Sequence, residues 1–583
     1  MCGPNPPLYP SLTLSRYLLA ENNFTQITTY EERPKPGGVW LSTPNLPPKE
    51  KRGPPEQPTN RPPFLSPLWP EKSYTIPQPR PKHEPEPIYL KDQLWMTESP
   101  IYDDLTTNLP KQLMKFTDLA LPDKAPLMPS HHVVQSYLEE YSKEVVEKDL
   151  VNLGSRVTSV LPMRDEQGNR TWEVTHTSVL DTAHTSTSTF DAVVVANGHY
   201  TSPFIPSLPG LSSWSSITTP SGSPLIIHSK SWRHPPLTPK KVLIVGAGIS
   251  GMDIADHIAK SGSQVLLASR TFKPGGTMEP MVTHGNITYV HPVAELLGEG
   301  KEGRSVKLKD GSVEGNIDQV IFATGYFYDF PFFTKETEST LGLTVGPDSR
   351  TGPVNAVLGL WQHLIPRDEP TLSFLGLPSR IVPFPVVEVQ SAFVARLLSG
   401  RIFLPSKDDM MEWESDTIFS KLKDGNTGLK YDIKDLIEEV ADGDKEEISR
   451  RARRYVNGDF HTLHGTDGAY INVISDLCSA ADRKTETREG RKVGKQAPYW
   501  DEKTMWTRRM VPIIQKVMRE GRKESTRELK EVEEVVGTFE HWKVVEKAGQ
   551  EVVEREKKRI FEEFGCGEEA KEKGEDPEEQ VGY

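Results

Sequence analysis

The sequence predicts an α/β fold built on parallel sheets, and two observations lead to it. Residues 242–245 (VLIV) form a short apolar run, as in a strand that is buried on both faces of a parallel sheet. Three glycines in the pattern GxGxxG and a helix-like segment follow directly, which is the order of a Rossmann-like βαβ unit. A second helix, strand and terminal acid occur in residues 12–33. The chain therefore has the marks of two Rossmann-like dinucleotide-binding domains.

Each glycine of the central unit has its own physical role. Gly246 lets the strand turn tightly, Gly248 lets the backbone approach a pyrophosphate, and Gly251 lets the next helix pack closely on the strand. We expect this helix to span 252–261 and to direct its N-terminal amides at the phosphates.

The next strand, expected at 264–268, indicates which dinucleotide is bound. It ends at Ser269 and Arg270, whereas an NAD-binding unit usually has an Asp or Glu there for the ribose 2′-hydroxyl. An arginine accommodates a 2′-phosphate instead, so the residues favour NADP.

The amino-terminal unit resembles the second half of another such domain. A helix is expected at 12–20 and a strand at 26–30, with Glu31 placed to bind a ribose hydroxyl. The preceding strand and its glycines are missing, because residues 1–11 (MCGPNPPLYPS) hold four prolines and a single glycine. Either this first glycine fingerprint is lost, or the sequence is an incorrectly started version of a longer chain.

Further strands end at candidate ligand contacts. The runs 190–195 and 319–322 lead into Asn197-Gly198 and Thr324-Gly325, and 156–160 and 171–177 are expected to form a hairpin. Asn108 lies on a loop before residues that we expect to begin a short helix. Its amide either caps that helix or faces a ligand, and the residues leave both open.

Composition excludes several classes of function. The 583 residues have a formal net charge of −13, so no basic excess is available for nucleic acid or an anionic membrane. Three scattered cysteines exclude a disulfide framework and a cysteine-based zinc site, and they fit a reducing compartment. We expect no metal, no membrane span and a cytoplasmic location, and homo-oligomerisation stays open.

Two long segments differ in composition from the rest. Residues 41–90 hold fifteen of the fifty prolines and are expected to form an extended loop. Residues 406–583 are rich in charge and helix-like, and we expect a helical extension with a disordered acidic tail at 567–583.

Taken together, the motifs resemble those of the flavin-containing monooxygenases. Within that family they suggest a soluble member of the fungal type. The similarity covers about residues 12–401 apart from the proline-rich loop, and is weaker over 460–477. It is carried by Tyr30-Glu31-Glu32-Arg33, Gly37-Gly38-Val39-Trp40, Thr107-Asn108-Leu109-Pro110, Asn197-Gly198-His199, His228-Ser229, the glycines at 246, 248 and 251, Ala323-Thr324-Gly325-Tyr326, and residues 383–390.

The resemblance implies an N,N-dimethylaniline monooxygenase-like enzyme with FAD and NADP as cofactors. In this family NADPH reduces FAD, and the reduced flavin takes up O₂ as a C4a-hydroperoxide. A small nitrogen- or sulfur-containing nucleophile then receives one oxygen atom. The flavin carries the difficult chemistry and the protein orients and shields it, so no acid–base pair or nucleophilic triad is needed.

The resemblance also assigns roles to residues of this chain. Asn108 is implied as the catalytic residue, with a neutral amide that donates a hydrogen bond without being an acid. The residues implied to bind cofactor are Glu31, Val39, Trp40, Thr107, Asn108, Leu109, Gly246, Gly248, Ser250, Gly251, Met252, Asp253, Ser269, Arg270 and Gln390.

The domain boundaries follow from these assignments. We expect an FAD-binding domain in two parts, 1–234 and 331–405, an inserted NADP-binding domain at 235–330, and the extension at 406–583. Two other functions stay open. Trp232 stands where Baeyer–Villiger ketone monooxygenases carry a tryptophan, and the missing glycine fingerprint would suit a non-catalytic remnant that binds NADP without FAD.

Overall fold

The computed structural model confirms the α/β class and places most of the predicted elements. It describes residues 8–33, 35–42, 88–90, 93–96, 99–179, 185–206, 208–215, 225–236, 238, 240–269, 285–300, 303–345, 356–423, 460–463, 465–490, 492–520 and 538–540. Most of the proline-rich segment, the acidic tail and Arg270 lie outside these ranges. Residues 1–7 do too, so the missing glycine fingerprint stays a prediction.

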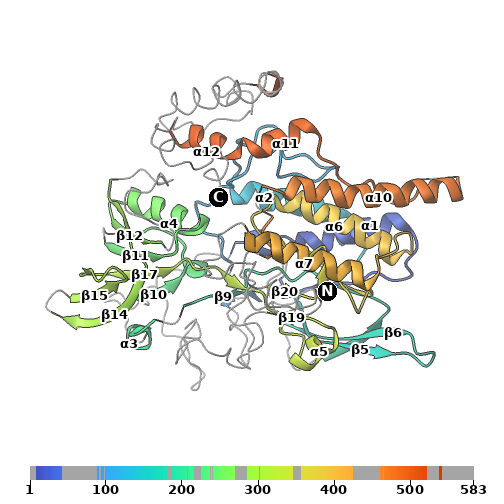
Figure 1. Ribbon diagram of the computed structural model, residues 1–583, viewed down its shortest axis with the longest axis horizontal. Coiled ribbons are helices and arrows are strands. Elements are labelled where there is room, and N and C mark those ends of the chain that lie inside the picture. The colour runs from blue at the N-terminus through green and yellow to red at the C-terminus, as the bar shows by residue number, and fades with distance from the viewer. Residues whose placement is uncertain are drawn as a thin grey trace, which may run out of the picture.

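The predicted NADP-binding domain is a five-stranded parallel sheet with α4 (Ile249–Lys260) against it, at the left of Figure 1. In spatial order its strands are β10 (Ile226–His228), β17 (Gln319–Phe322), β11 (Lys241–Val245), β12 (Gln264–Ala268) and β13 (Ile287–Val290). The apolar run at 242–245 is in the middle strand and is almost fully buried, as predicted. An antiparallel sheet of β14 (Val293–Gly300), β15 (Gly303–Leu308) and β16 (Val313–Glu314) follows β13 in the chain.

The other predicted domain has its parallel strands in two separate pairs among the described residues. Strand β1 (Thr29–Glu31) pairs with β4 (Val151–Leu153), and β8 (Val193–Val195) pairs with β23 (Leu372–Phe374). All residues of β1, β8 and β23 are buried, as expected for strands inside a covered sheet. Strand β1 is shorter than the predicted 26–30, but Glu31 ends it as predicted.

Helices cover this domain in a layer at the right of Figure 1. Helix α1 (Leu8–Glu21) packs between α2 (His131–Glu147) and α6 (Pro383–Leu398), and α10 (Asp467–Glu489) packs along α6. Because α1 has neighbours on both sides, even its Thr13 is fully buried, and the hydroxyl donates to the Tyr9 carbonyl. The predicted hairpin is confirmed as β5 (Ser155–Arg164) and β6 (Arg170–Ser178), with β7 (Thr185–Phe190) added to it.

The remaining elements are short connections and the extension. They are η1 (Gly38–Trp40), β2 (Ile88–Leu90), β3 (Gln93–Met96), β9 (Ser202–Pro203), α3 (Leu211–Ser215), η3 (Ser229–Ser231), β18 (Tyr326–Phe327), α5 (Lys335–Thr340), β19 (Thr344–Val345), β20 (Val357–Leu358), β21 (Leu360–Trp361), β22 (Ile365–Pro366), α7 (Lys407–Lys423), α11 (Glu502–Arg509) and α12 (Val511–Glu520). The helical character predicted for the extension is therefore confirmed.

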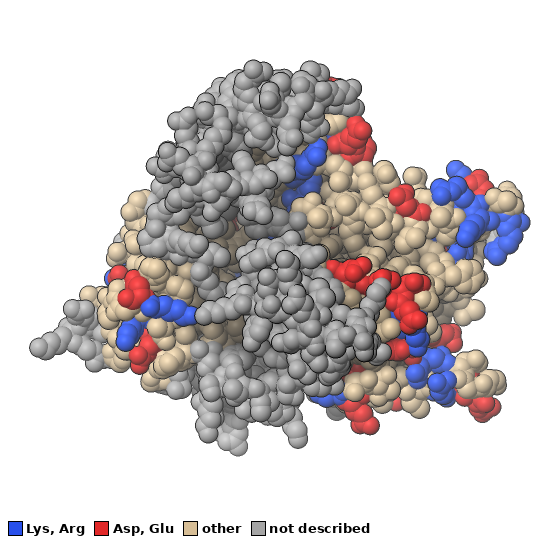
Figure 2. Space-filling model, in the orientation of Figure 1, with Lys and Arg blue, Asp and Glu red and all other residues tan. Residues whose placement is uncertain are grey.

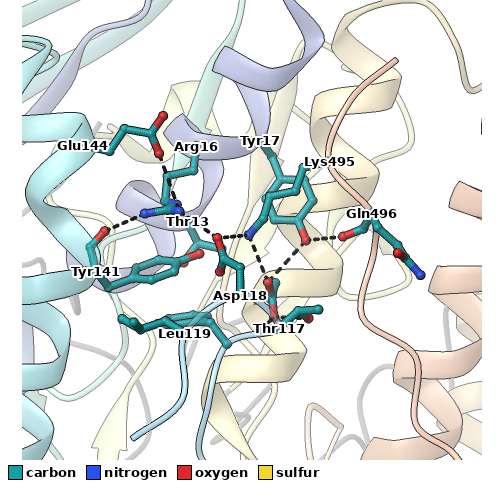
Figure 3. A network of polar contacts seen from close by, with 12 residues as sticks. Thr13, Arg16, Tyr17, Thr117, Asp118, Leu119, Tyr141, Glu144, Lys495 and Gln496 are labelled. Carbon is teal, nitrogen blue, oxygen red and sulfur yellow. Dashed lines mark hydrogen bonds and ion pairs between the residues drawn. The ribbon is translucent and has the colours of Figure 1, made fainter. Parts of the chain in front are cut away.

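Polar contacts of residues 495 and 496 in the extension reach α1, α6 and the segment before α2. Lys495 Nζ lies 3.0 Å from a carboxylate oxygen of Asp118 and 3.5 Å from one of Glu388, and Figure 3 shows it between Asp118 and Tyr17. The Tyr17 hydroxyl donates to the Gln496 carbonyl at 2.8 Å. Removing the partner of a buried ion destabilises a fold strongly. This part of the extension therefore supports the domain that it contacts.

The charged surface agrees with the composition. On the face drawn in Figure 2, the described lysines and arginines form small groups beside aspartates and glutamates. The described residues of this face thus carry no broad basic field of the kind that nucleic acid requires.

Candidate functional site

The glycine turn after β11 is shaped by two very close backbone approaches. A Cβ on Gly251 would lie 1.9 Å from the Gly246 carbonyl oxygen, and one on Gly246 would lie 2.4 Å from that of Ala323. Gly246 also has a φ of +110°, which side chains disfavour. A Cβ on Gly248 would meet nothing within 4 Å, so this backbone is open to a ligand.

Helix α4 begins at this opening in a way that suits an anion. Its N-cap is Gly248, which has no side chain to bond the first amides, and Ile249 and Ser250 are exposed. Unsatisfied amides at a helix N-terminus bind phosphate through hydrogen bonds and the helix dipole. Met252 is partly buried against the core beneath. This turn fits the pyrophosphate of a dinucleotide.

Asp253 has a different environment from the other predicted NADP residues. Its carboxylate accepts a hydrogen bond from the Tyr102 hydroxyl, and Tyr102 is 4% exposed. The Tyr102 ring also lies edge-on to Trp232, with centroids 4.8 Å apart. The pair therefore fastens the segment that leads to Asn108 onto α4, close to the glycine turn.

Ser269 follows β12 as predicted and is buried at 7% exposure, with its amide donating to the Val290 carbonyl at 3.3 Å. Its partner in the predicted 2′-phosphate site, Arg270, lies outside the described residues.

Glu31 is the best-fitting residue for a second nucleotide. It is fully buried, and one carboxylate oxygen accepts the Arg33 backbone N–H at 2.7 Å. The other, Oε2, has no hydrogen-bond partner in the described part of the chain. Burial raises the pKa of Glu31 to about 8, against the lowering effect of the Arg33 amide. A ribose hydroxyl would supply the donor that Oε2 lacks, so the residue fits a dinucleotide.

The loop after Glu31 holds Val39 and Trp40 at an intermediate level of burial. They lie in η1, where the Val39 carbonyl accepts a hydrogen bond from the Ser99 hydroxyl at 2.5 Å. The Trp40 ring lies edge-on to Phe384, with centroids 6.4 Å apart. The loop thus packs on α6 through Trp40, and the side chains of Val39 and Trp40 remain partly accessible.

Asn108 is exposed between two buried neighbours, Thr107 and Leu109. The Thr107 amide donates to the Pro129 carbonyl at 2.9 Å and its hydroxyl to the Leu109 carbonyl at 3.0 Å. Within the described chain the Asn108 side-chain amide has no hydrogen-bond partner. The predicted helix after Asn108 is wrong, because residues 111–113 form a turn. Pro110 begins it, and the Leu113 amide donates back to the Pro110 carbonyl.

The same loop contains a contact that the sequence did not predict. The Gln515 side-chain amide, from α12, donates a hydrogen bond to the Asn108 carbonyl. Gln515 is 407 residues away in sequence and lies in the extension, which showed no catalytic pattern. No local motif could have revealed it.

Gln390 and His228 have their polar atoms occupied by the protein. The Gln390 amide accepts from the Gly376 N–H at 2.9 Å and donates to the Tyr470 hydroxyl at 3.0 Å. His228 accepts the Lys230 N–H and contacts the Gly325 carbonyl, both at 3.1 Å, and burial lowers its pKa to about 3. Both side chains have structural contacts, and a flavin contact of Gln390 stays a prediction.

Comparison with known proteins decides the family. A family model described as "Flavin-binding monooxygenase-like" matches residues 90–286 and 281–442. The chain belongs to this family. The flavin-containing monooxygenase FMO GS-OX-like 2 of Arabidopsis thaliana is 32% identical over 361 residues, which cover 60% of this chain and 71% of that protein. FMO GS-OX1 of the same plant is 33% identical over 341 residues, 57% of this chain and 67% of that protein.

Solved structures agree with this assignment. S-allyl-L-cysteine S-oxygenase from Allium sativum matches with a TM-score of 0.58 and 25% identity, over 89% of this chain and 93% of that one. The Tmm protein of Pelagibacter sp. strain HTCC7211 has the same fold, with a TM-score of 0.51 and 19% identity over 82% of this chain and 88% of that one.

The predicted enzyme class and cofactors are confirmed at this level. The protein is a flavin monooxygenase, an oxidoreductase with FAD and NADP as cofactors. No helix among its described residues is long and apolar enough to cross a membrane.

Proposed function

We propose that this flavin monooxygenase uses NADPH and O₂ to oxygenate a small nitrogen- or sulfur-containing nucleophile. The observation that carries the proposal is the Tyr102–Asp253 hydrogen bond, which brings the Asn108 segment to the helix that begins at the glycine turn. The similarity to an S-oxygenase supports a sulfur nucleophile within this class.

On the NADP side, Gly246, Gly248 and Gly251 would form the turn around the pyrophosphate, with Ser250 at the start of α4. Backbone amides suit this role because they bind a phosphate without adding a counter-charge that must be desolvated. Ser269 and Arg270 would then meet the 2′-phosphate.

On the FAD side, Glu31 would accept a ribose hydroxyl on its unpartnered oxygen, and Val39 and Trp40 would line the cofactor. Bound FAD supplies the redox and oxygen chemistry. This chain's own residues bind and orient the two nucleotides and keep water out.

Asn108 would act through its exposed side-chain amide. A neutral amide donates a hydrogen bond to the oxygen atom that is to be transferred, and it cannot protonate that oxygen prematurely. Its buried neighbours Thr107 and Leu109 would fix the direction in which the amide points.

The deciding experiment offers the purified protein NADPH, O₂ and either a thioether or a cyclic ketone. We expect visible flavin absorbance, NADPH oxidation and a sulfoxide product. Exclusive ester formation from the ketone would instead identify a Baeyer–Villiger enzyme. Trp232 would then be the tryptophan that this group of enzymes carries at that position. A protein without flavin bands even after FAD is added, but with NADP bound, would be the non-catalytic remnant.

The proposal also covers the partners of the protein and its location in the cell. Beyond its small-molecule substrate and O₂ we propose no nucleic-acid partner, on the net charge of −13. We also propose a cytoplasmic location, which fluorescence microscopy of a tagged chain would test.

A further inference from the structure

Helix α12 lies far from Asn108 in sequence but contacts it directly. Its Gln515 is 6% exposed and donates its side-chain amide to the Asn108 carbonyl. Residues 511–520 also lie beyond residue 442, where the match to the flavin-binding monooxygenase family ends. Gln515 therefore lies in the extension, outside the residues that the family model matches.

We propose that α12 braces the Asn108 loop, defined as residues 105–111, and that Gln515 is a positioning residue for oxygen transfer. The consequence for oxygenation rests on the function proposed above. The brace itself is a property of the folded chain.

The Gln515 contact adds to bonds within the loop, among them the bond from the Thr107 hydroxyl to the Leu109 carbonyl at 3.0 Å. The two ends of the loop are held by backbone bonds, from the Thr107 N–H to the Pro129 carbonyl at 2.9 Å and from the Lys111 N–H to the Leu127 carbonyl at 2.8 Å. Between them, the exposed Asn108 side chain has no partner in the described chain. The Gln515 bond restrains the peptide plane between Asn108 and Leu109, and with it the backbone from which the Asn108 side chain projects.

The brace is rigid because α12 is itself anchored. Val511 and Ile514 are 2% and 1% exposed, so they hold the helix on the core. Just before α12, the Arg508 guanidinium contacts the buried Asp467 carboxylate at 3.0 and 3.1 Å. Asp467 in turn accepts the Val382 N–H at the start of α6, at 2.9 Å. A continuous set of contacts therefore links α6 to the loop.

Two substitutions separate the hydrogen bond from the packing. Gln515→Met keeps the length of the side chain and removes the donor. Gln515→Glu keeps the shape, but its carboxylate faces the Asn108 carbonyl and cannot donate until it is protonated. Gln135→Met is the matched control, because the Gln135 amide bonds Glu139 on α2 rather than the loop.

The first readout is hydrogen exchange of the peptide that contains Thr107 and Lys111, measured by mass spectrometry without substrate. Loss of one hydrogen bond should speed its exchange about fivefold in Gln515→Met, and leave Gln135→Met like the wild type. Gln515→Glu should show the same faster exchange at neutral pH, because its ionised carboxylate cannot donate to the Asn108 carbonyl.

The second readout is the yield of oxygenated product per NADPH oxidised. We expect Gln515→Met to lower this yield about fivefold, with the difference appearing as hydrogen peroxide, and with little change in the KM for NADPH. Unchanged exchange in both Gln515 variants would overturn the brace. Faster exchange with an unchanged yield would overturn the positioning role.

Failure of the proposed function gives a different result. If the wild-type protein oxygenates neither substrate class, the proposed reaction falls, and with it the positioning role. The exchange experiment still reports on the brace in that case, because it needs neither cofactor nor turnover.

Discussion

At the scale of single residues, the candidate site combines a buried acidic side chain with an exposed amide side chain. Glu31 is a fully buried carboxyl with an unpartnered oxygen, and Asn108 is an exposed amide between buried neighbours. The sequence predicted Glu31 from its place at a strand end. Burial and the missing partner depend on packing from distant segments, so no local pattern reports them.

The first prediction concerns the pH dependence of Glu31. Burial raises its pKa from the usual 4.5 to about 8, so the folded cofactor-free protein holds a proton that the unfolded chain releases in this range. Stability should therefore fall as pH rises from about 4.5 to 8. Glu31→Gln removes the ionisation and should be more stable than wild type at pH 8 by about 2 kcal/mol. Urea unfolding at pH 5, 6, 7 and 8 measures this.

The control for this experiment is Glu139→Gln, at a carboxyl on the surface helix α2. The unfolding free energy of this variant should change with pH as steeply as that of the wild type. An equal slope in the wild type and Glu31→Gln would contradict the prediction. At a pH above the raised pKa of Glu31, the same Glu31→Gln variant should bind FAD more weakly, since an amide is a poorer acceptor than a carboxylate.

The second prediction tests Asn108. Asn108→Asp keeps the shape but replaces the donor by an ionised acceptor, and we expect the oxygenated product to fall by roughly 10²-fold while NADPH is still oxidised to give peroxide. Product and peroxide are quantified together. Asn23→Asp, at an exposed position between α1 and β1, should match the wild type. Full product yield in Asn108→Asp would remove Asn108 from catalysis.

At the scale of elements, one hairpin is held in an unfavourable conformation by the extension. The three-residue turn between β21 and β22 spans residues 362–364, and its first two, Gln362 and His363, have φ of +52° and +55°. Such a turn normally needs Asn or Gly. The Tyr470 hydroxyl donates to the Gln362 carbonyl at 2.9 Å, and the Nδ1 atoms of His461 and His363 are 3.0 Å apart. Sequence rules missed the turn because distant residues stabilise it.

The third prediction follows from the different surroundings of these two residues. Gln362→Gly relieves the positive φ and keeps the backbone carbonyl, so it should stabilise the protein by about 0.5–1 kcal/mol. His363→Gly relieves similar strain but leaves Nδ1 of the buried His461 without its partner, and should destabilise the protein by about 2–4 kcal/mol. Urea midpoints of the two variants should move in opposite directions. A shift in the same direction would refute this account.

At the scale of the whole molecule, the sequence predicted the two-domain α/β fold because each unit is local. The strand at 264–268 and its glycine turn lie within 30 residues of one another, so periodicity and spacing suffice. The helix predicted after Asn108 failed because Pro110 begins a turn stabilised by neighbouring segments. The partners of Asp118, Glu388 and Asn108 in residues 495–515 lie too far along the chain for any pattern to show.

The fourth prediction tests whether the extension supports the fold. Lys495→Met leaves Glu388, which is 1% exposed in its side chain, without its cation, whereas Asp118 keeps Arg16 at 2.7 Å. We expect a loss of about 2–3 kcal/mol in unfolding free energy. Lys492→Met, at an exposed position of the same segment, is the control. Adding Glu388→Gln to Lys495→Met should recover part of the loss, and no recovery would argue against the shared ion pair.

The Tyr102 hydroxyl has a mechanical consequence. Since it donates to Asp253 on α4, any movement of α4 away from the Asn108 segment must break that hydrogen bond. In the proposed function, the glycine turn that would hold NADP and the segment that carries Asn108 would therefore stay together for as long as this bond is intact.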